Sequence, residues 1–216
     1  MSQEIKDRFR QFVAPTYGRF PITLDRGEGA YVWDTDGKRY LDLGGGIAVN
    51  CLGHAHPEIS QVLAEQSSRL MHCTNFYHFD GQARLAENLA KRLGPGRMFF
   101  GNSGAEASEV MFKLARRLGQ TDGRFEIITA ENSFHGRTMA GISASGQAKV
   151  KEGFAPLLQG FVHVPYNDID AVRSAISPAT VAVMIEGIQG EGGIHPATTQ
   201  YPVSYTHLTL PTNREV

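Results

Sequence analysis

Short apolar runs alternate with amphipathic stretches through most of the chain after residue 56. The apolar runs have the length of buried strands and cover residues 98–100, 125–129, 161–164 and 181–185. Apolar residues spaced three and four positions apart predict helices over residues 57–70, 81–93, 104–118 and 168–176. Because apolar strands that alternate with helices are typical of sheets covered on both faces, the pattern predicts an α/β fold with a mostly parallel sheet.

The first part of the chain follows a different pattern. Residues 1–29 are polar and interrupted by proline and glycine, which indicates an extended arm without a sustained period. A β-hairpin is predicted next, with strands over residues 31–34 and 39–43. The strands are joined at Asp36-Gly37, a pair typical of a type I′ turn. We therefore expect an N-terminal part at residues 1–55 and a larger α/β part at residues 56–200.

The last stretch of the chain has neither a helical nor a strand period. Residues Val203–Thr212 resemble the translation of a sequencing-library adapter read in one frame, and an ordinary polar tail is the alternative. We expect residues 201–216 to be a non-native tail on a truncated gene product.

Composition narrows the class of protein. The 21 lysines and arginines nearly balance the 22 aspartates and glutamates, which argues against a nucleic-acid partner. No apolar run approaches the roughly 18 residues of a membrane helix, and the N-terminus lacks the apolar segment of a secretory signal. Two cysteines cannot form a disulfide scaffold, so we expect a cytoplasmic protein without a membrane partner.

The strongest local signal lies where the predicted strand at 98–100 ends and the next helix begins. Ser103 and Glu106 match the S-x-x-E capping box. Backbone N–H groups and the positive end of a helix dipole attract anions, and Gly104 and Ala105 leave room for a phosphate. Ser103 adds a hydroxyl donor. A capped helix with nothing bound is the alternative reading.

Two further segments follow strand ends, where ligands bind in open parallel sheets. Residues 132–138 offer Phe134 for stacking on a planar ring and Arg137 for a carboxylate. Residues 186–193 offer two carboxylates among four glycines. The alternatives are a core phenylalanine, a surface ion pair and a plain glycine-rich turn. The histidines lack metal-ligand spacing, so we expect no metal site, and His54 and His56 are expected to bond backbone groups at the following helix start.

Taken in order, these segments resemble the N-terminal half of a class-III pyridoxal-phosphate-dependent aminotransferase. The acetylornithine/ornithine aminotransferase subgroup is the most similar, over roughly residues 12–196. The matching blocks are Trp33-Asp-Thr-Asp-Gly37, Leu52-Gly-His-Ala-His-Pro57, Asn102-Ser-Gly-Ala-Glu-Ala107, Phe134-His-Gly-Arg-Thr138 and Gln189-Gly-Glu-Gly-Gly193. The resemblance implies a partial fold-type I transferase, with a small-domain segment in residues 1–55 and an incomplete cofactor-binding large domain in residues 56–200.

The resemblance also implies roles for individual residues. Ser103, Gly104 and Ala105 would hold the phosphate of pyridoxal 5′-phosphate, and Phe134 would stack on its ring. Arg137 would receive the substrate α-carboxylate, and Glu191 would pair with an arginine from the C-terminal part of the family's sequence. The implied partners are a small-molecule amino acid, a 2-oxo acid and a second copy of the chain in a homodimer.

The family's catalytic residues are expected to be missing from this sequence. Its Schiff-base lysine and its pyridinium-pairing aspartate follow the Gln-Gly-Glu-Gly-Gly block, whereas the last lysine here is Lys151. We thus expect an inactive fragment of an enzyme that transfers the terminal amino group of N-acetylornithine or a related ω-amino substrate to 2-oxoglutarate, as in arginine biosynthesis. The alternatives are an aminotransferase for ornithine, 4-aminobutyrate or succinyldiaminopimelate, or a non-catalytic module that binds a phosphorylated ligand.

Overall fold

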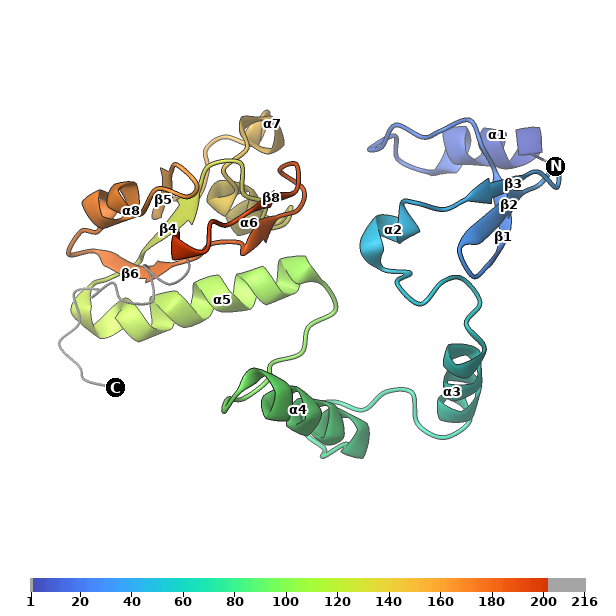
Figure 1. Ribbon diagram of the computed structural model, residues 1–216, viewed down its shortest axis with the longest axis horizontal. Helices are drawn as coiled ribbons and strands as arrows, with labels where there is room; N and C mark the ends of the chain where they lie inside the picture. The colour runs from blue at the N-terminus through green and yellow to red at the C-terminus, as the bar shows by residue number, and fades with distance from the viewer. Residues whose placement is uncertain (1, 202–216) are drawn as a thin grey trace. The chain divides into compact units, whose positions relative to one another are not determined.

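The structure, a computed structural model, describes residues 2–201 (Figure 1). The adapter-like stretch Val203–Thr212 lies outside the described residues. The chain divides into two compact units, residues 1–87 and 88–216, which we describe separately. The boundary that we expect near residue 55 stays a prediction.

The first unit contains a three-stranded antiparallel sheet in the order β1-β2-β3. Its strands are β1 (Leu24–Glu28), β2 (Tyr31–Asp34) and β3 (Arg39–Leu41). The helices in this part of the chain are α1 (Ser2–Phe12), α2 (Gly45–Ala48), α3 (Pro57–Ser67) and α4 (Asp80–Leu93), the last of which runs into the second unit. The expectation of an irregular arm at residues 1–29 was wrong, because α1 and β1 lie within it.

The hairpin at residues 31–43 is confirmed, but its turn is not type I′. The Gly37 N–H donates to the Asp34 carbonyl at 3.0 Å, and Gly37 has a φ of 81°. Asp36 does not have a positive φ, whereas a type I′ turn needs two consecutive positive φ values. The Asp34 side chain stabilises the turn instead, since its Oδ1 accepts from the backbone N–H groups of Asp36 and Lys38.

The second unit contains the predicted parallel sheet, in the order β5-β4-β6. Its strands are β4 (Glu126–Ala130), β5 (Phe161–Val164) and β6 (Thr180–Val183), and a short antiparallel pair follows in β7 (Ile188–Gln189) and β8 (His195–Pro196). The helices are α5 (Gly104–Gly119), α6 (Met139–Ala144), α7 (Ala148–Lys151) and α8 (Ile169–Ala175). The strand expected at residues 98–100 is wrong: that segment carries no strand, and Phe99 is exposed.

The centre of the second unit lies around β4, whose side chains are buried on both faces. Ile127 packs in one cluster with Phe112 of α5 and with Ala140 and Ala144 of α6. Ile128 points to the opposite face and packs with Val172 of α8. Consecutive strand residues point to opposite faces, so helices cover both sides of this sheet, as the apolar run predicted. This layering places α5 and α8 on opposite sides of the strands (Figure 1).

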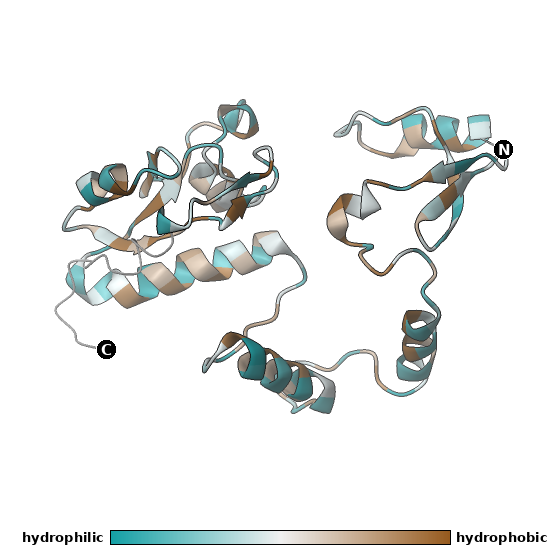
Figure 2. Cartoon of the chain, in the orientation of Figure 1, coloured by the Kyte–Doolittle hydropathy of each residue, from teal (hydrophilic) through white to brown (hydrophobic). Residues whose placement is uncertain are grey.

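Many large apolar side chains of the described residues are exposed. Ile47, Phe76 and Leu43 are 95%, 91% and 88% exposed, and Val32 is the one apolar residue of the first unit that is buried among residues 2–87. Hydrophobic residues, coloured brown, occur along the chain of both units (Figure 2). Apolar surface of this extent is typical of faces that bind other protein surfaces. Within residues 2–201, no helix combines the length and the apolar character that crossing a membrane requires.

Candidate ligand site at the strand ends

The N-terminus of α5 has the predicted cap. Ser103 has extended backbone angles, and its Oγ accepts a hydrogen bond of 3.2 Å from the Glu106 backbone N–H. In a capping box the Glu106 side chain would accept from the Ser103 backbone N–H. Here the Glu106 carboxylate bonds the preceding residue instead: it accepts from the Asn102 backbone N–H at 2.6 Å and from the Asn102 amide at 3.0 Å. The hydroxyl hydrogen of Ser103 remains a donor for a ligand in front of the helix.

The first turn of α5 leaves space for an anion. A Cβ added to Gly104 would meet no heavy atom within 4 Å, and both Ser103 and Gly104 are exposed. The first N–H groups of an α-helix have no partner within the helix, and the helix dipole adds positive charge there. The turn therefore offers backbone donors, a hydroxyl and open space, which together suit a phosphate group.

The turn that follows β4 packs directly on this helix end. Gly136 has a φ of 102°, and a Cβ added there would lie 3.1 Å from both Cα and Cβ of Ala105. A side chain at this position would be strained, because L residues rarely adopt this φ and the contact with Ala105 would be tight. Phe134 is half-buried and Arg137 is exposed, with Cζ of Arg137 5.9 Å from the centroid of the Phe134 ring. The structure thus brings the first two predicted segments together.

The segment that follows β6 is bonded to the same turn. The Phe134 backbone N–H donates to Oε2 of Glu186 at 3.1 Å, and the buried Gln189 amide donates to the Glu131 carbonyl at 2.8 Å. Glu191 accepts from the Gln147 amide, which also bonds the Asn132 carbonyl at 3.2 Å. The third predicted segment therefore joins the other two at the carboxyl edge of the sheet, and the pairing of Glu191 with an arginine stays a prediction.

Burial shifts the pKa values of two groups behind this surface. Burial raises the pKa of the Glu186 carboxyl above its ordinary value, and the nearby negative charge of Glu191 raises this pKa further. His135 is 5% exposed, and burial lowers the pKa of its imidazole to about 4, with a smaller contribution from the His163 ring. His135 is therefore neutral at pH 7.

Sequence reasoning assigned no individual role to Glu186, His135 or Gly136. Each lies inside a segment that the sequence singled out, but a single sequence does not show which strand end bonds to which turn. The signal that could have found Gly136 is its position between Phe134 and Arg137, because a glycine between two ligand-facing residues indicates a close backbone approach. Glu186 and His135 become evident only from contacts across the fold.

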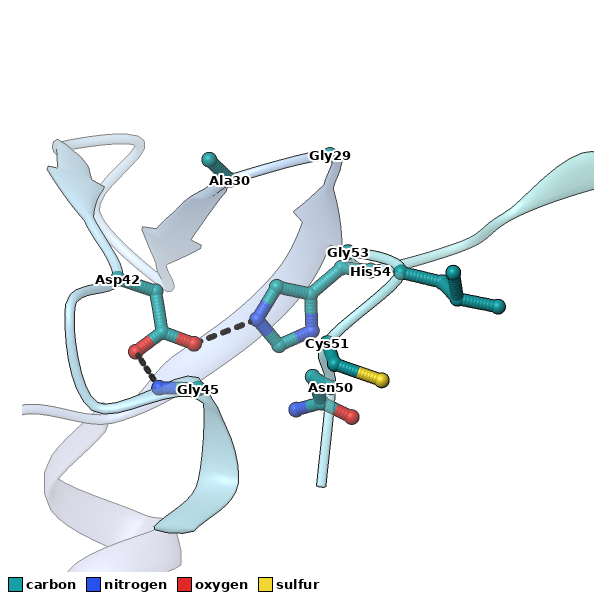
Figure 3. Close-up of a pocket in the computed structure, with 9 residues that line it drawn as sticks. Gly29, Ala30, Asp42, Gly45, Asn50, Cys51, Gly53 and His54 are labelled. Atoms are coloured by element: carbon teal, nitrogen blue, oxygen red, sulfur yellow. Dashed lines mark hydrogen bonds and ion pairs between the residues drawn. The ribbon is translucent and has the colours of Figure 1, made fainter. Parts of the chain in front are cut away.

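A second hollow lies in the first unit, around the segment that joins β3 to α3 (Figure 3). Its volume is about 300 Å³, and the Asp42 carboxylate and the His54 ring meet in it at 2.7 Å. The hydrogen bond from His54 lowers the pKa of the Asp42 carboxyl most, followed by the bond from the Gly45 backbone N–H.

The expectation that His54 and His56 bond backbone groups at the helix start was wrong. The His54 ring binds Asp42, and His56 Nδ1 is buried without a hydrogen-bond partner among the described residues. Within residues 2–201, no three His, Cys, Asp or Glu side chains gather as a metal site would require.

The fold and the site define an α/β protein in which a helix N-terminus suited to a phosphate lies at the carboxyl edge of the parallel sheet. Residues 12–213 match the class-III aminotransferase family, and the chain belongs to that family. It is 48% identical over 195 residues to the acetylornithine aminotransferase of Caldanaerobacter subterraneus, covering 89% of this chain and 50% of that protein. The corresponding enzyme of Gloeobacter violaceus is 49% identical over 200 residues, with 91% and 50% covered.

Solved structures agree with this assignment. The ornithine aminotransferase of Toxoplasma gondii ME49 superposes with a TM-score of 0.87 at 30% identity, over 94% of this chain and 49% of that chain. The acetylornithine aminotransferase of Elizabethkingia anophelis gives a TM-score of 0.77 at 28% identity, over 95% and 49%. The chain thus spans about half the length of each of these four aminotransferases.

The family's cofactor is pyridoxal 5′-phosphate. The residues of this site fit the cofactor. The open space in front of Gly104 suits its phosphate, and the half-buried Phe134 ring, in the turn after β4, suits stacking on its ring. The contact between Gly136 and Ala105 keeps these two groups adjacent.

Proposed function

We propose that this chain supplies the cofactor-binding half of a transaminase. The protein to which it belongs transfers the terminal amino group of N-acetylornithine, or of a related ω-amino substrate, to 2-oxoglutarate. The observation that carries the proposal is the junction of the first turn of α5 with the segments that follow β4 and β6. Identity of 48% and 49% to two acetylornithine aminotransferases supports the choice of substrate class.

In this proposal the phosphate of the cofactor binds at the N-terminus of α5. Ser103 donates its hydroxyl hydrogen while its Oγ lone pair keeps the cap on Glu106. The backbone N–H groups of Gly104 and Ala105 point along the helix dipole toward the phosphate. When bound, pyridoxal phosphate supplies an aldehyde that takes up the amino group and a ring that withdraws electrons from the substrate.

The side chains of Phe134 and Arg137 beside the phosphate position determine what else binds. Phe134 packs its ring against the cofactor ring, and the Arg137 guanidinium, 5.9 Å from the Phe134 ring, receives the α-carboxylate of the amino acid. Glu191 is placed for exchange of partners, because Gln147 is a neutral donor that a cationic arginine can displace. We further propose that two copies pair as a cytoplasmic homodimer, which the exposed apolar surface of both units supports.

Ligand binding by this chain tests the cofactor site. Pyridoxal phosphate is titrated into the chain and into the Ser103→Ala variant, with Ser108→Ala as a matched control within α5. We expect the Ser103 variant to bind several-fold more weakly, because it loses a phosphate donor, and the control to bind as the parent does. Equal binding by all three proteins would contradict the site.

Substrate choice is tested on the complete enzyme, expressed from the full reading frame. We expect N-acetylornithine to be used in preference to ornithine, 4-aminobutyrate and succinyldiaminopimelate. Arg137→Ala should raise the KM for the amino donor about tenfold or more, since a bidentate guanidinium–carboxylate contact contributes roughly 1.5–3 kcal/mol. An unchanged KM would refute the role of Arg137. Binding of phosphorylated ligands with no transamination by the complete protein would favour the non-catalytic module.

A further inference from the structure

Glu186 is a half-buried carboxylate that the proposed function leaves without a role. It follows β6, and its Oε2 accepts the Phe134 backbone N–H at 3.1 Å. The Gly190 backbone N–H also bonds this carboxylate, and the Tyr166 hydroxyl donates to the Glu186 carbonyl at 2.8 Å. Both the side chain and the backbone of Glu186 are therefore fixed by other parts of the second unit.

Its contact with Phe134 differs from the other bonds that hold the turn after β4. The backbone N–H groups of Asn132 and Ser133 donate to the carbonyls of Gly146 and Ala130, and the His135 N–H donates to the Ser145 hydroxyl at 2.9 Å. All of these partners are neutral. Phe134 is the residue of this turn whose N–H is held by an ionisable side chain, and that side chain comes from another strand end.

We propose that Glu186 is a positioning residue that sets the orientation of the Phe134 ring toward the bound ligand. The inference rests on the proposed function, because it takes Phe134 as the ring-stacking residue. A backbone hydrogen bond at Phe134 N restrains the φ of this residue and so the direction of its Cα–Cβ bond. The Glu186 carboxylate is bonded to the backbone of Phe134 and Gly190 and not to the first turn of α5, so its effect should fall on the ligand ring and spare the phosphate.

The acceptor oxygen and the negative charge of Glu186 contribute to this contact separately. Hydrogen bonds to an ionised acceptor are shorter and stronger than those between neutral groups. Burial and the negative charge of Glu191 both raise the pKa of Glu186, so ionising this side chain costs free energy that a neutral side chain would not. A glutamine keeps an acceptor oxygen at the same reach, so it should retain most of the positioning, whereas alanine should lose it.

Two probes separate ring binding from phosphate binding. One is 4-deoxypyridoxine 5′-phosphate, which has the ring and the phosphate but no aldehyde, and the other is inorganic phosphate. Both are titrated into the full 216-residue chain and its Glu186→Ala and Glu186→Gln variants. Glu152→Ala, which removes an exposed carboxylate at the end of α7, is the matched control.

We expect Glu186→Ala to weaken binding of the ring-containing probe about five- to tenfold, which corresponds to the loss of one hydrogen bond, with phosphate affinity unchanged. Glu186→Gln and Glu152→Ala should stay within about twofold of the parent on the same scale. Equal affinity of the parent and Glu186→Ala for the ring probe would overturn the inference and leave the proposed function standing. A parent chain that binds neither probe would instead refute the proposed function.

A spectroscopic measurement keeps the inference testable if Glu186→Ala does not fold. The amide resonance of Phe134 should shift with pH as Glu186 titrates, and the shift should disappear in Glu186→Gln. A purely structural contribution would lower the melting temperature and weaken both probes in the same proportion. That outcome, or an unchanged Phe134 titration in Glu186→Gln, would overturn the positioning role.

Discussion

His135 should make the second unit lose stability as the pH falls below neutrality. Its side chain is 5% exposed, its Nε2 is buried without a hydrogen-bond partner among the described residues, and burial lowers the pKa of the imidazole to about 4. In the unfolded chain an imidazole has a pKa of about 6.5. The unfolded state therefore binds more protons than the folded state between about pH 6.5 and 4, and the free energy of unfolding falls as the pH falls.

The magnitude follows from the difference between the two pKa values. A depression of about 2.5 units at 1.36 kcal/mol per unit gives a loss of about 3 kcal/mol between pH 7 and pH 4, as an order of magnitude. The pKa of His163 is lowered as well, first by burial and then by the adjacent Lys151 ammonium. Its contribution stays in a His135 variant, so the difference between the two proteins isolates His135.

Urea unfolding at several pH values, followed by circular dichroism, measures the effect. His135→Gln removes the titrating group, and His195→Gln removes an exposed imidazole as the control. We expect the stability of the parent and of the control to fall more steeply toward pH 4 than that of His135→Gln. Parallel profiles for all three proteins, or a His135 resonance that titrates near pH 6.5 in the folded chain, would refute the reasoning.

Three further substitutions test the cap, the close approach and the core. Ser103→Ala should destabilise the second unit by about 0.5–2 kcal/mol through loss of the α5 cap, which urea unfolding measures. Gly136→Ala should cost about 1–3 kcal/mol for its positive φ and should displace the turn from Ala105, visible as reduced pyridoxal phosphate affinity. Ile128→Ala should cost about 2–5 kcal/mol, because its side chain is completely buried between the sheet and α8; a loss below about 1 kcal/mol would argue against this packing.

The parallel sheet could be predicted because its strands are buried on both faces. Ile127 and Ile128 in β4 and Phe161 and Val162 in β5 are apolar at successive positions, and turns and helices separate the two runs, so the pattern indicates both the strands and their surroundings. The helices α4 and α5 were found for a related reason, since their apolar residues recur at three and four positions. Their ends differ from the predicted ends by one residue or none.

Elements that depend on tertiary context were missed. The helix α1 has no buried residue among its described positions, and β1 contains Gly27, so neither shows the apolar period that sequence reasoning requires. Residues 98–100 are apolar enough to resemble a strand, yet Phe99 is exposed. The apolar character of a short segment does not show whether another strand lies beside it to pair with.

The candidate site was also predicted only in part from the sequence. Ser103, Phe134 and Arg137 could be proposed because each follows a predicted strand, where ligands of parallel sheets bind. The link from Glu186 to Phe134 spans 52 positions of the chain, and the contact of Gly136 with Ala105 spans 31. Such contacts follow from the order of strands in the sheet, which a single sequence does not contain.

Amide chemical-shift mapping of pyridoxal phosphate binding tests the central claim most directly. If the ligand binds where the first turn of α5 meets the segments after β4 and β6, the amides of Gly104, Ala105 and Phe134 should show the largest shifts, and inorganic phosphate should reproduce those at Gly104 and Ala105. Shifts confined to the first unit, around Asp42 and His54, or no shifts at millimolar ligand, would contradict the account.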